Sequence, residues 1–221
     1  GFHLPPWVPV AFILLLVAVP SAIYLPGVIE RALNTGRTPR TGSEPIEATE
    51  LPEDLTDLSG QFRYILTEDE VADLVGRIGS LFNDFRDNLA QREANRLLLS
   101  NASPLVKERI RLVSSYFRTA SFVEPPRDRF SYDEVAEEPW LYNGCYVIWR
   151  GQTSNIDVDE EAITFTLLVG YEDERVLEGT ANVTVPFTAD VQPGGVELVA
   201  EVVAQGDEFS LVATSIRRIV L

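Results

Sequence analysis

Alternating apolar and polar side chains in the C-terminal part constrain this chain more than any other feature. In residues 163–169, for example, every second side chain is large and apolar. A period of two is typical of β-strands with one buried face. The turn signals Pro193–Gly195 and Gln205–Glu208 predict that hairpins join neighbouring strands. We therefore expect a curved antiparallel sheet of about five strands over residues 139–221.

Helical periodicity precedes this sheet. Residues Thr67–Glu70 have the pattern of a capping box, and the apolar residues that follow recur at helical spacing, which predicts a helix over 67–98. Ser103-Pro104 is a second start signal, with Ser at the N-cap and Pro at the first helical position, and predicts a helix over 104–119. The order of elements predicts an α+β domain over 67–221, with two helices packed on one face of the sheet.

The segment from Leu4 to Ile29 carries no charged side chain. At 1.5 Å per residue a helix of this length crosses a hydrocarbon core of about 30 Å. Trp7 and Tyr24 bracket its most apolar part and suit two membrane interfaces, so we predict them as interface anchors. The alternatives are a signal peptide, for which a basic leader and a cleavage site are not evident, and a buried core helix. We predict a transmembrane helix with its flanks over 1–30.

Residues 31–66 are rich in Thr, Pro, Gly, Ser and Glu, and poor in large apolar side chains. This composition predicts a flexible linker. The alternative is that the segment packs along a partner through its scattered apolar residues. Those residues are Ile46, Leu51, Leu55 and Leu58.

The charges around the predicted span give conflicting indications of its orientation. Arg31, Arg37 and Arg40 follow the span, and the positive-inside rule would place the large domain in the cytoplasm. The scarcity of Cys and the usual arrangement of single-pass proteins favour the other side. We expect a single-pass membrane protein whose folded domain is extracytoplasmic.

The chain is strongly acidic, with 34 Asp and Glu against 18 Lys and Arg and a net charge of −16. Such a charge argues against nucleic acid as a partner, because no basic surface would attract a polyanion. The acidity lies in the sheet half, since residues 121–221 hold nineteen acidic and six basic side chains. Its usual meaning is a solvated, protected sheet face. The alternative is a recognition face for a basic partner or a cation.

Candidate catalytic and metal-binding groups are few. One Cys and one His exclude an internal disulfide, a Cys₄ or Cys₂His₂ zinc site and most histidine chemistry. Asp157–Glu161 resembles a calcium loop, but no Gly stands at its sixth position and Leu168 occupies the twelfth, so we interpret it as an acidic hairpin loop. Cys145 has no activating neighbour and is expected to be buried. We predict no catalytic residue, no metal site and no cofactor.

Two groups of side chains remain as candidates for a pocket or an interface. The aromatic candidates are Trp140, Tyr142, Tyr146 and Trp149. They form either a packed core or the lining of a pocket for a ring-bearing ligand. The basic candidates, Arg217 and Arg218, lie late in the last strand, one facing each side, and either pair with the acidic half or contact a partner.

This order of elements resembles the NTF2-like group of cystatin-like α+β folds. The helix over 67–98, the Ser103-Pro104 start and the strands from Leu141 onward carry the resemblance. It implies a similarity to the inner-membrane assembly subunits of type IV secretion systems, which place such a domain after a membrane helix. Enzymes of the group use pocket Asp and His residues, and no His follows His3, so no catalytic role carries over.

These observations together predict a non-catalytic, single-pass structural or assembly subunit of a membrane complex. Its expected partners are the lipid bilayer and other subunits of the complex, or further copies of itself, and not nucleic acid. One alternative is an extracytoplasmic ligand-binding or sensing domain with an aromatic-lined pocket. The other is an enzyme that works through carboxylates.

Overall fold

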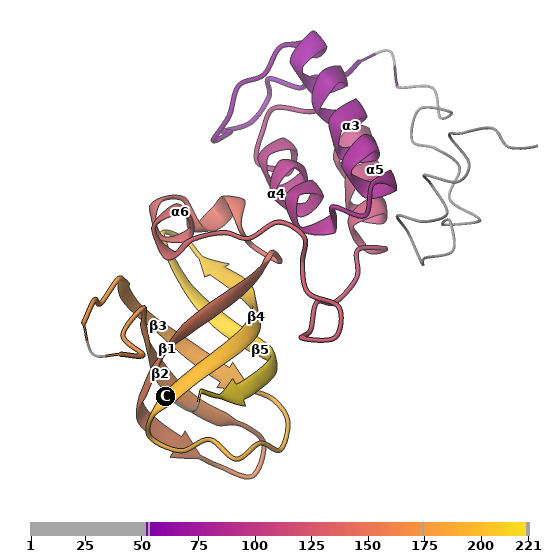
Figure 1. Ribbon diagram of the computed structural model, residues 1–221. Helices are drawn as coiled ribbons and strands as arrows, with labels where there is room; N and C mark the ends of the chain where they lie inside the picture. The colour runs from indigo at the N-terminus through magenta and orange to yellow at the C-terminus, as the bar shows by residue number, and fades with distance from the viewer. Residues whose placement is uncertain (1–51, 53, 174, 220–221) are drawn as a thin grey trace, which may run out of the picture. The chain divides into compact units, whose positions relative to one another are not determined.

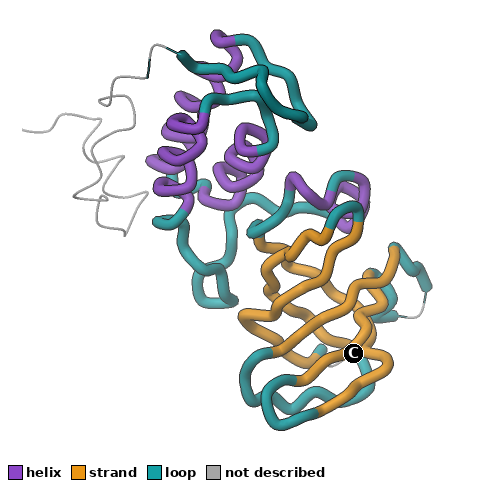
Figure 2. Tube along the Cα trace, turned by 180° about the vertical axis from the view of Figure 1, so that it is seen from behind, coloured by secondary structure: helices purple, strands orange, loops and turns teal. Residues whose placement is uncertain are grey.

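A computed structural model describes residues 52, 54–173 and 175–219, in which helices precede strands (Figure 1). The helical elements are α3 (Glu68–Asn83), α4 (Asp87–Leu98), α5 (Pro104–Ser114), α6 (Tyr132–Glu137) and the 3-10 helix η2 (Pro139–Leu141). The strands are β1 (Tyr146–Val158), β2 (Ile163–Val169), β3 (Gly179–Val185), β4 (Gly195–Gln205) and β5 (Glu208–Arg218). Figure 2 shows α3, α4 and α5 grouped together and the strands gathered in one sheet.

The sheet closes on itself as a barrel in the order β1-β2-β3-β5-β4. Its neighbouring strands are antiparallel except for β3 and β5, which run parallel from Asn182↔Ser210 to Thr184↔Val212. The inward side chains of all five strands form one buried core. They are Val147, Trp149, Ile163, Phe165, Leu167, Val169, Ala181, Val183, Val185, Val196, Leu198, Ala200, Val202, Leu211 and Ala213.

The first strand passes from one neighbour to another along its length. Residues 146–152 of β1 pair with β4, and residues 151–158 pair with β2. At the crossing, a Cβ on Gly151 would lie 2.1 Å from the carbonyl oxygen of Leu168. Because real atoms never approach so closely, glycine is required where β1 joins the two halves of the barrel.

The predicted curved sheet covered by two helices is wrong. The parallel pair β3–β5 joins strands whose paired residues are far apart in sequence, and it turns a row of hairpins into a closed barrel. A closed barrel buries the apolar side of every strand inside itself, so it needs no helical layer over one face. For the same reason the fold is not NTF2-like.

The helix expected over 67–98 is divided in two. Phe85 has a φ of 57°, a left-handed conformation that ends α3 and turns the chain into α4. The capping box is confirmed, since the Thr67 hydroxyl accepts from the Glu70 amide and the Glu70 carboxylate accepts from the Thr67 amide. The second expected helix, over 104–119, is α5 and ends at Ser114.

Helices α3, α4 and α5 have a core of their own. Its buried members are Leu66, Val71, Leu74, Val75, Ile78, Ala94, Leu97, Ala102, Val106 and Ile110. The described end of the predicted linker packs on this unit. The Asp57 amide donates to the Asn101 carbonyl at 2.7 Å, and the Ser103 amide donates to the Leu55 carbonyl at 2.8 Å. Residues 54–66 are therefore part of the helical fold rather than a free tether.

Two buried asparagines of α4 contact the start of the barrel. The Asn88 amide group donates to the carbonyls of Asp128 and Tyr146 at 2.8 Å, and its oxygen accepts from the Tyr146 amide at 2.6 Å. Asn95 donates to the carbonyls of Leu141 and Asn143 at 2.8 and 2.7 Å. These bonds satisfy backbone groups of the segment that enters β1.

No helix within residues 52–219, as far as the structure describes them, has the length and apolar character of a membrane span. The span predicted over Leu4 to Ile29, with its anchors Trp7 and Tyr24, lies outside the described residues. It therefore stays a prediction.

Candidate functional site

The structure places Tyr142 and Trp149 in the core of the barrel, where aromatic rings close the end next to α6. The Tyr142 ring packs edge-on against Phe130 at 4.8 Å between centroids, and burial raises the pKa of its phenol. The ring centroid of Trp149 lies 5.5 Å from that of Tyr132 and 6.0 Å from that of Phe209. The indole N–H of Trp149 donates to the Phe130 carbonyl at 2.9 Å. These two residues belong to one packed cluster.

The other two aromatic candidates are only partly buried: Trp140 packs against the edge of that core, and Tyr146 lies outside it. Trp140 on η2 donates its indole N–H to the Tyr64 hydroxyl at 2.9 Å, and the Arg63 guanidinium lies 3.6 Å from its ring centroid. Tyr146 is half-buried on the outer side of β1, and burial raises the pKa of its phenol. Of the four aromatic residues predicted as one group, three thus lie in or against the barrel core, and only Tyr146 lies outside it.

Arg217 belongs to a charged ladder across three strands. Arg150 of β1 pairs with Glu197 of β4 at 2.8 Å, and Arg217 of β5 donates to the other oxygen of the same carboxylate at 2.6 Å. Burial raises the pKa of Glu197, but hydrogen bonds and charges from the two arginines outweigh it and hold that pKa below its usual 4.5. Arg218, at the end of β5, has no ion-pair partner among the described residues.

Sequence reasoning found Arg217 and missed Arg150 and Glu197. Glu197 alternates with apolar neighbours as an ordinary solvent-facing residue would, yet only 6% of its surface is exposed. The register that sets it opposite Arg150 on one side and Arg217 on the other joins three separate strands. No local signal in the sequence distinguishes it from Glu201.

The outer surface of β2 and β3 is lined by short polar side chains. Cross-strand pairs join Thr164 to Thr184 and Thr166 to Asn182. We call the polar members the hydroxyl face: Thr164, Thr166, Thr180, Asn182 and Thr184. The aromatic ring that these two strands contribute, Phe165, is buried in the core on the other side. The face offers hydrogen-bond donors and acceptors but no ring from β2 or β3 on which a base or sugar could stack.

Carboxylates gather at the β1–β2 turn, which we call the acidic turn, Asp157–Glu161. Asp159 accepts from the backbone amides of Glu161 and Ala162, both at 2.8 Å, and these bonds lower its pKa. The segment is thus a hairpin turn, as expected. Asp157, Glu160 and Glu161 are exposed, and none forms an ion pair with a described residue.

A second group of acidic residues lies at the β4–β5 turn, at the opposite end of the strands. Asp207 and Glu208 are both exposed there, and Asp207 lies 3.6 Å from Arg63. Together with the acidic turn, they leave carboxylates beyond both ends of the barrel strands.

A hollow of about 370 Å³ opens on the barrel beside the charged ladder. It is lined by Arg129, Ile148, Trp149, Arg150, Val169, Gly170, Glu172, Glu178 and Glu197. The Oε2 atom of Glu172 is buried and has no hydrogen-bond partner among the described residues. A buried carboxylate oxygen in this state can accept a hydrogen bond from an incoming cation.

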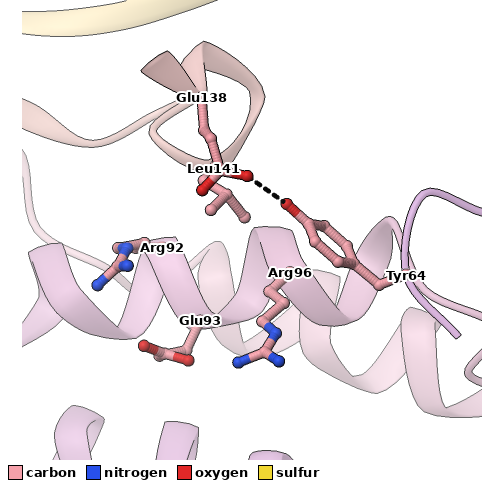
Figure 3. Close-up of a pocket in the computed structure, with 6 residues that line it drawn as sticks. All are labelled: Tyr64, Arg92, Glu93, Arg96, Glu138 and Leu141. Carbon is pink, nitrogen blue, oxygen red and sulfur yellow. Dashed lines mark hydrogen bonds between the residues drawn. The ribbon is translucent and has the colours of Figure 1, made fainter. Parts of the chain in front are cut away.

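A smaller pocket of about 240 Å³ borders α4 (Figure 3). The Tyr64 hydroxyl donates to Glu138 at 3.4 Å, and Glu93 is engaged by Arg77 at 3.4 Å. Both Arg92 and Arg96 line this pocket, and each guanidinium lies near a different ring, at 5.5 Å from the centroid of Tyr142 and 5.9 Å from the centroid of Tyr64. Sequence reasoning did not single out these residues.

Cys145 is fully buried, as expected, and burial raises the pKa of its thiol. A thiol in such a place stays protonated and is a poor nucleophile. Within the residues that the structure describes, no group of His, Cys, Asp and Glu side chains is arranged to hold a metal ion.

Comparison with known families divides the chain as the fold does. Residues 53–114 match the model of a domain of unknown function, DUF8514, and residues 124–217 match the model described as a Spirochaete C-terminal OB fold. The second match agrees with the closed five-stranded barrel and replaces the NTF2-like resemblance. No protein among the curated sequences matches the chain.

Solved structures show distant likenesses. A chain of the S. pombe Stn1-ten1 complex is 18% identical with a TM-score of 0.26, and the alignment covers 34% of this chain and 57% of that chain. RecJ from Thermus thermophilus in complex with Mg²⁺ is 14% identical with a TM-score of 0.28, and the alignment covers 56% of this chain and 21% of RecJ. The chain thus spans less than two thirds of the length of either of these proteins.

Proposed function

We propose that this chain is a non-catalytic assembly subunit whose barrel docks a basic segment of a partner protein. The observation that carries the proposal is the acidic turn beside the hydroxyl face, where Asp157, Glu160 and Glu161 are exposed without an ion pair among the described residues. Carboxylates placed in this way attract Lys and Arg side chains and repel anions.

OB folds commonly bind oligonucleotides or oligosaccharides on the face of their second and third strands and on two flanking loops. In this barrel both corresponding turns carry carboxylates, at Asp157–Glu161 and at Asp207-Glu208. Single-stranded nucleic acid needs a positive groove and aromatic stacking platforms. The hydroxyl face supplies neither, so a basic protein segment suits this surface better than a nucleic acid.

The surfaces around the barrel suggest how such a segment would be held. Threonine hydroxyls and the Asn182 amide can bond the main chain of an extended peptide, while the acidic turn receives its cationic side chains. The hollow with the unpartnered Glu172 oxygen can take one further cation. Because exposed charges are screened by salt, we expect binding to weaken steeply as ionic strength rises.

The test is binding of a fluorescent Lys/Arg-rich peptide to the purified full chain, measured by anisotropy. Replacing Glu160→Gln together with Glu161→Gln should weaken binding about tenfold, the loss expected from two screened charge pairs. The matched control, Glu124→Gln with Glu137→Gln, removes the same charge from exposed positions away from the turn and should leave binding nearly unchanged. Equal losses in both variants, or tighter binding of single-stranded DNA than of the peptide, would refute the proposal.

The proposed assembly role also includes attachment to a membrane through the apolar segment Leu4 to Ile29, which only the sequence supports. A chain that lacks residues 1–30 should move from the membrane fraction to the supernatant. Resistance of the full chain to alkaline extraction would support a spanning segment. Its release by alkali would contradict one.

A further inference from the structure

The hollow beside the charged ladder has an apolar wall and charged side chains from several elements. Ile148, Trp149 and Val169 form the apolar wall, at the end of the β1–β2 hairpin away from the acidic turn. A hollow of about 370 Å³ with such a wall is in the size range of small-molecule sites. The charged side chains that line it are Arg129, Arg150, Glu172, Glu178 and Glu197.

Two of these five charged side chains satisfy each other. Arg150 donates to Glu197 at 2.8 Å as part of the charged ladder. The charge of Glu172 acts on Arg150, but from beyond the distance of an ion pair. The side chains of Arg129, Glu172 and Glu178 form no hydrogen bond or ion pair with any residue that the structure describes. The hollow therefore leaves one cation and two carboxylates without partners.

The two carboxylates are held in different ways. The Oε2 atom of Glu172 is buried without a hydrogen-bond partner among the described residues, which is unfavourable for an ionised group. Glu178 is exposed, and its aliphatic stem lies over Gly170, where an added Cβ would be 2.8 Å from its Cγ atom. A cationic donor that enters the hollow would supply the partner that Glu172 lacks.

We propose that the hollow binds a free basic amino acid such as lysine. At neutral pH this ligand carries one carboxylate and two ammonium groups, which match the unpaired Arg129, Glu172 and Glu178 one for one. Its methylene chain would lie along Ile148 and Val169. A simple amine would leave Arg129 without a partner, and a neutral amino acid would leave one carboxylate without one. The site does not include the acidic turn and does not depend on the proposed function.

The first part of the test compares lysine with three analogues that each lack one charged group. 1,5-Diaminopentane lacks the carboxylate, 6-aminohexanoate lacks the α-ammonium group and norleucine lacks the ε-ammonium group. Isothermal titration calorimetry with the full chain measures each dissociation constant. We expect lysine to bind about tenfold more tightly than each analogue, because every analogue loses one charge-assisted contact.

The second part uses variants that remove one charged side chain of the hollow. Arg129→Gln should weaken lysine about tenfold but should not weaken diaminopentane, which has no carboxylate to lose. Glu172→Gln and Glu178→Gln should each weaken both ligands. The matched controls are Arg111→Gln on α5 and Glu137→Gln on α6, which change exposed residues outside the hollow and should bind lysine like the unaltered chain.

Results with the ligands and with Arg129 can overturn the proposal. If lysine does not bind, the hollow is no site for a basic amino acid. If diaminopentane binds as tightly as lysine, the hollow takes cations only, as a docked basic segment would supply. Equal losses from Arg129→Gln and Arg111→Gln would mean that Arg129 does not meet the ligand carboxylate.

A further comparison separates this site from the acidic turn. Glu160→Gln together with Glu161→Gln, which tests the proposed function, should leave lysine binding unchanged. A loss equal to that of Glu178→Gln would mean that lysine binds acidic surfaces in general, and it would refute the proposal. Glu178 is exposed, so its replacement should leave the melting temperature unchanged, and it repeats the test should Glu172→Gln disturb the fold.

Discussion

At the scale of single side chains, two buried asparagines hold α4 against the segment that enters β1. Asn88 and Asn95 sit on α4, but their amide groups donate to backbone carbonyls that lie outside that helix. A buried amide in this position stabilises only the arrangement that satisfies it. The cost of losing such a group is the desolvation of the partners left behind, and not merely the bond itself.

Replacing Asn88→Ala should therefore destabilise the chain strongly. The Tyr146 amide and the Asp128 and Tyr146 carbonyls would lose their partner, at a cost of about 2–4 kcal/mol in the free energy of unfolding. Urea unfolding measures this cost. The control Asn83→Ala changes an exposed asparagine at the end of α3 and should cost about 0.5 kcal/mol or less. If Asn88→Ala and Asn83→Ala lowered the free energy of unfolding equally, the buried hydrogen bonds of Asn88 would not stabilise the fold.

Glu197→Gln should destabilise the chain in a pH-dependent way. The pKa of Glu197 is lowered in the folded state, so its carboxylate contributes stability that is present above the unfolded value of 4.5 and is lost as pH falls through the folded value. At pH 7 the free energy of unfolding of the variant should be lower by about 1 kcal/mol. The loss is this small because solvent screens the exposed guanidiniums of Arg150 and Arg217.

Melting curves between pH 7 and about pH 3 test this linkage. The difference between the unaltered chain and Glu197→Gln should shrink as the pH falls below 4.5. Glu208→Gln, at an exposed site without an ion pair among the described residues, is the control and should show no such trend. A difference that stays constant with pH would mean that the charge of Glu197 does not stabilise the fold.

At the scale of elements, local patterns predicted the strands and the helix starts, but not the closure of the strands into a barrel. Alternation in 163–169 and the capping box at Thr67 depend on neighbouring residues, so the sequence displays them directly. The pairing of Asn182 with Ser210 links residues distant in sequence and leaves no local trace. The break at Phe85 was equally hidden, because a bulky residue rarely adopts a positive φ.

Packing of α6 on β3 requires a glycine. A Cβ on Gly179 would lie 2.2 Å from the Tyr132 ring, whose hydroxyl donates to the Thr180 carbonyl at 3.2 Å. Gly179→Ala should therefore cost about 1–3 kcal/mol through overpacking, measured by thermal or urea unfolding. Gly76→Ala, a helical site with nothing within 4 Å of the added carbon, should instead stabilise by about 0.5–1 kcal/mol.

A double-mutant cycle identifies the clash as the cause. With Tyr132→Ala already in place, the added Cβ at Gly179 has room, so Gly179→Ala should cost much less than in the unaltered chain. Strict additivity of the two changes would place the cost in the strand backbone and not in the contact with α6.

For the whole molecule, the sequence showed where the acidic charge lies but not what it does. The excess of acidic residues in 121–221 was interpreted as a solvated sheet face, with a basic partner or a cation as the alternative, and the exposed acidic turn is the surface on which we propose that a basic partner binds. Of the two interpretations of the aromatic residues, the structure agrees with the packed core, since Tyr142 and Trp149 lie in the barrel core and Trp140 packs against it. Side chains on separate strands come into contact only when the strands pair. The sequence therefore could not show that Glu197 contacts Arg150 and Arg217.

The described helices and the barrel should unfold as one unit, although they match different family models. The carbonyls of Leu141, Asn143 and Tyr146 depend on α4 for hydrogen bonds, so opening the helix exposes unsatisfied groups at the start of β1. Hydrogen exchange in rising denaturant should therefore give the amides of Ala94 and Val147 the same free energy of opening. Replacing both asparagines of α4 by alanine should separate the two values, with Ala94 exchanging first. If the Ala94 amide of the unaltered chain already exchanged at a much lower denaturant concentration than the Val147 amide, the hydrogen bonds of the two asparagines would be too weak to couple helix and barrel.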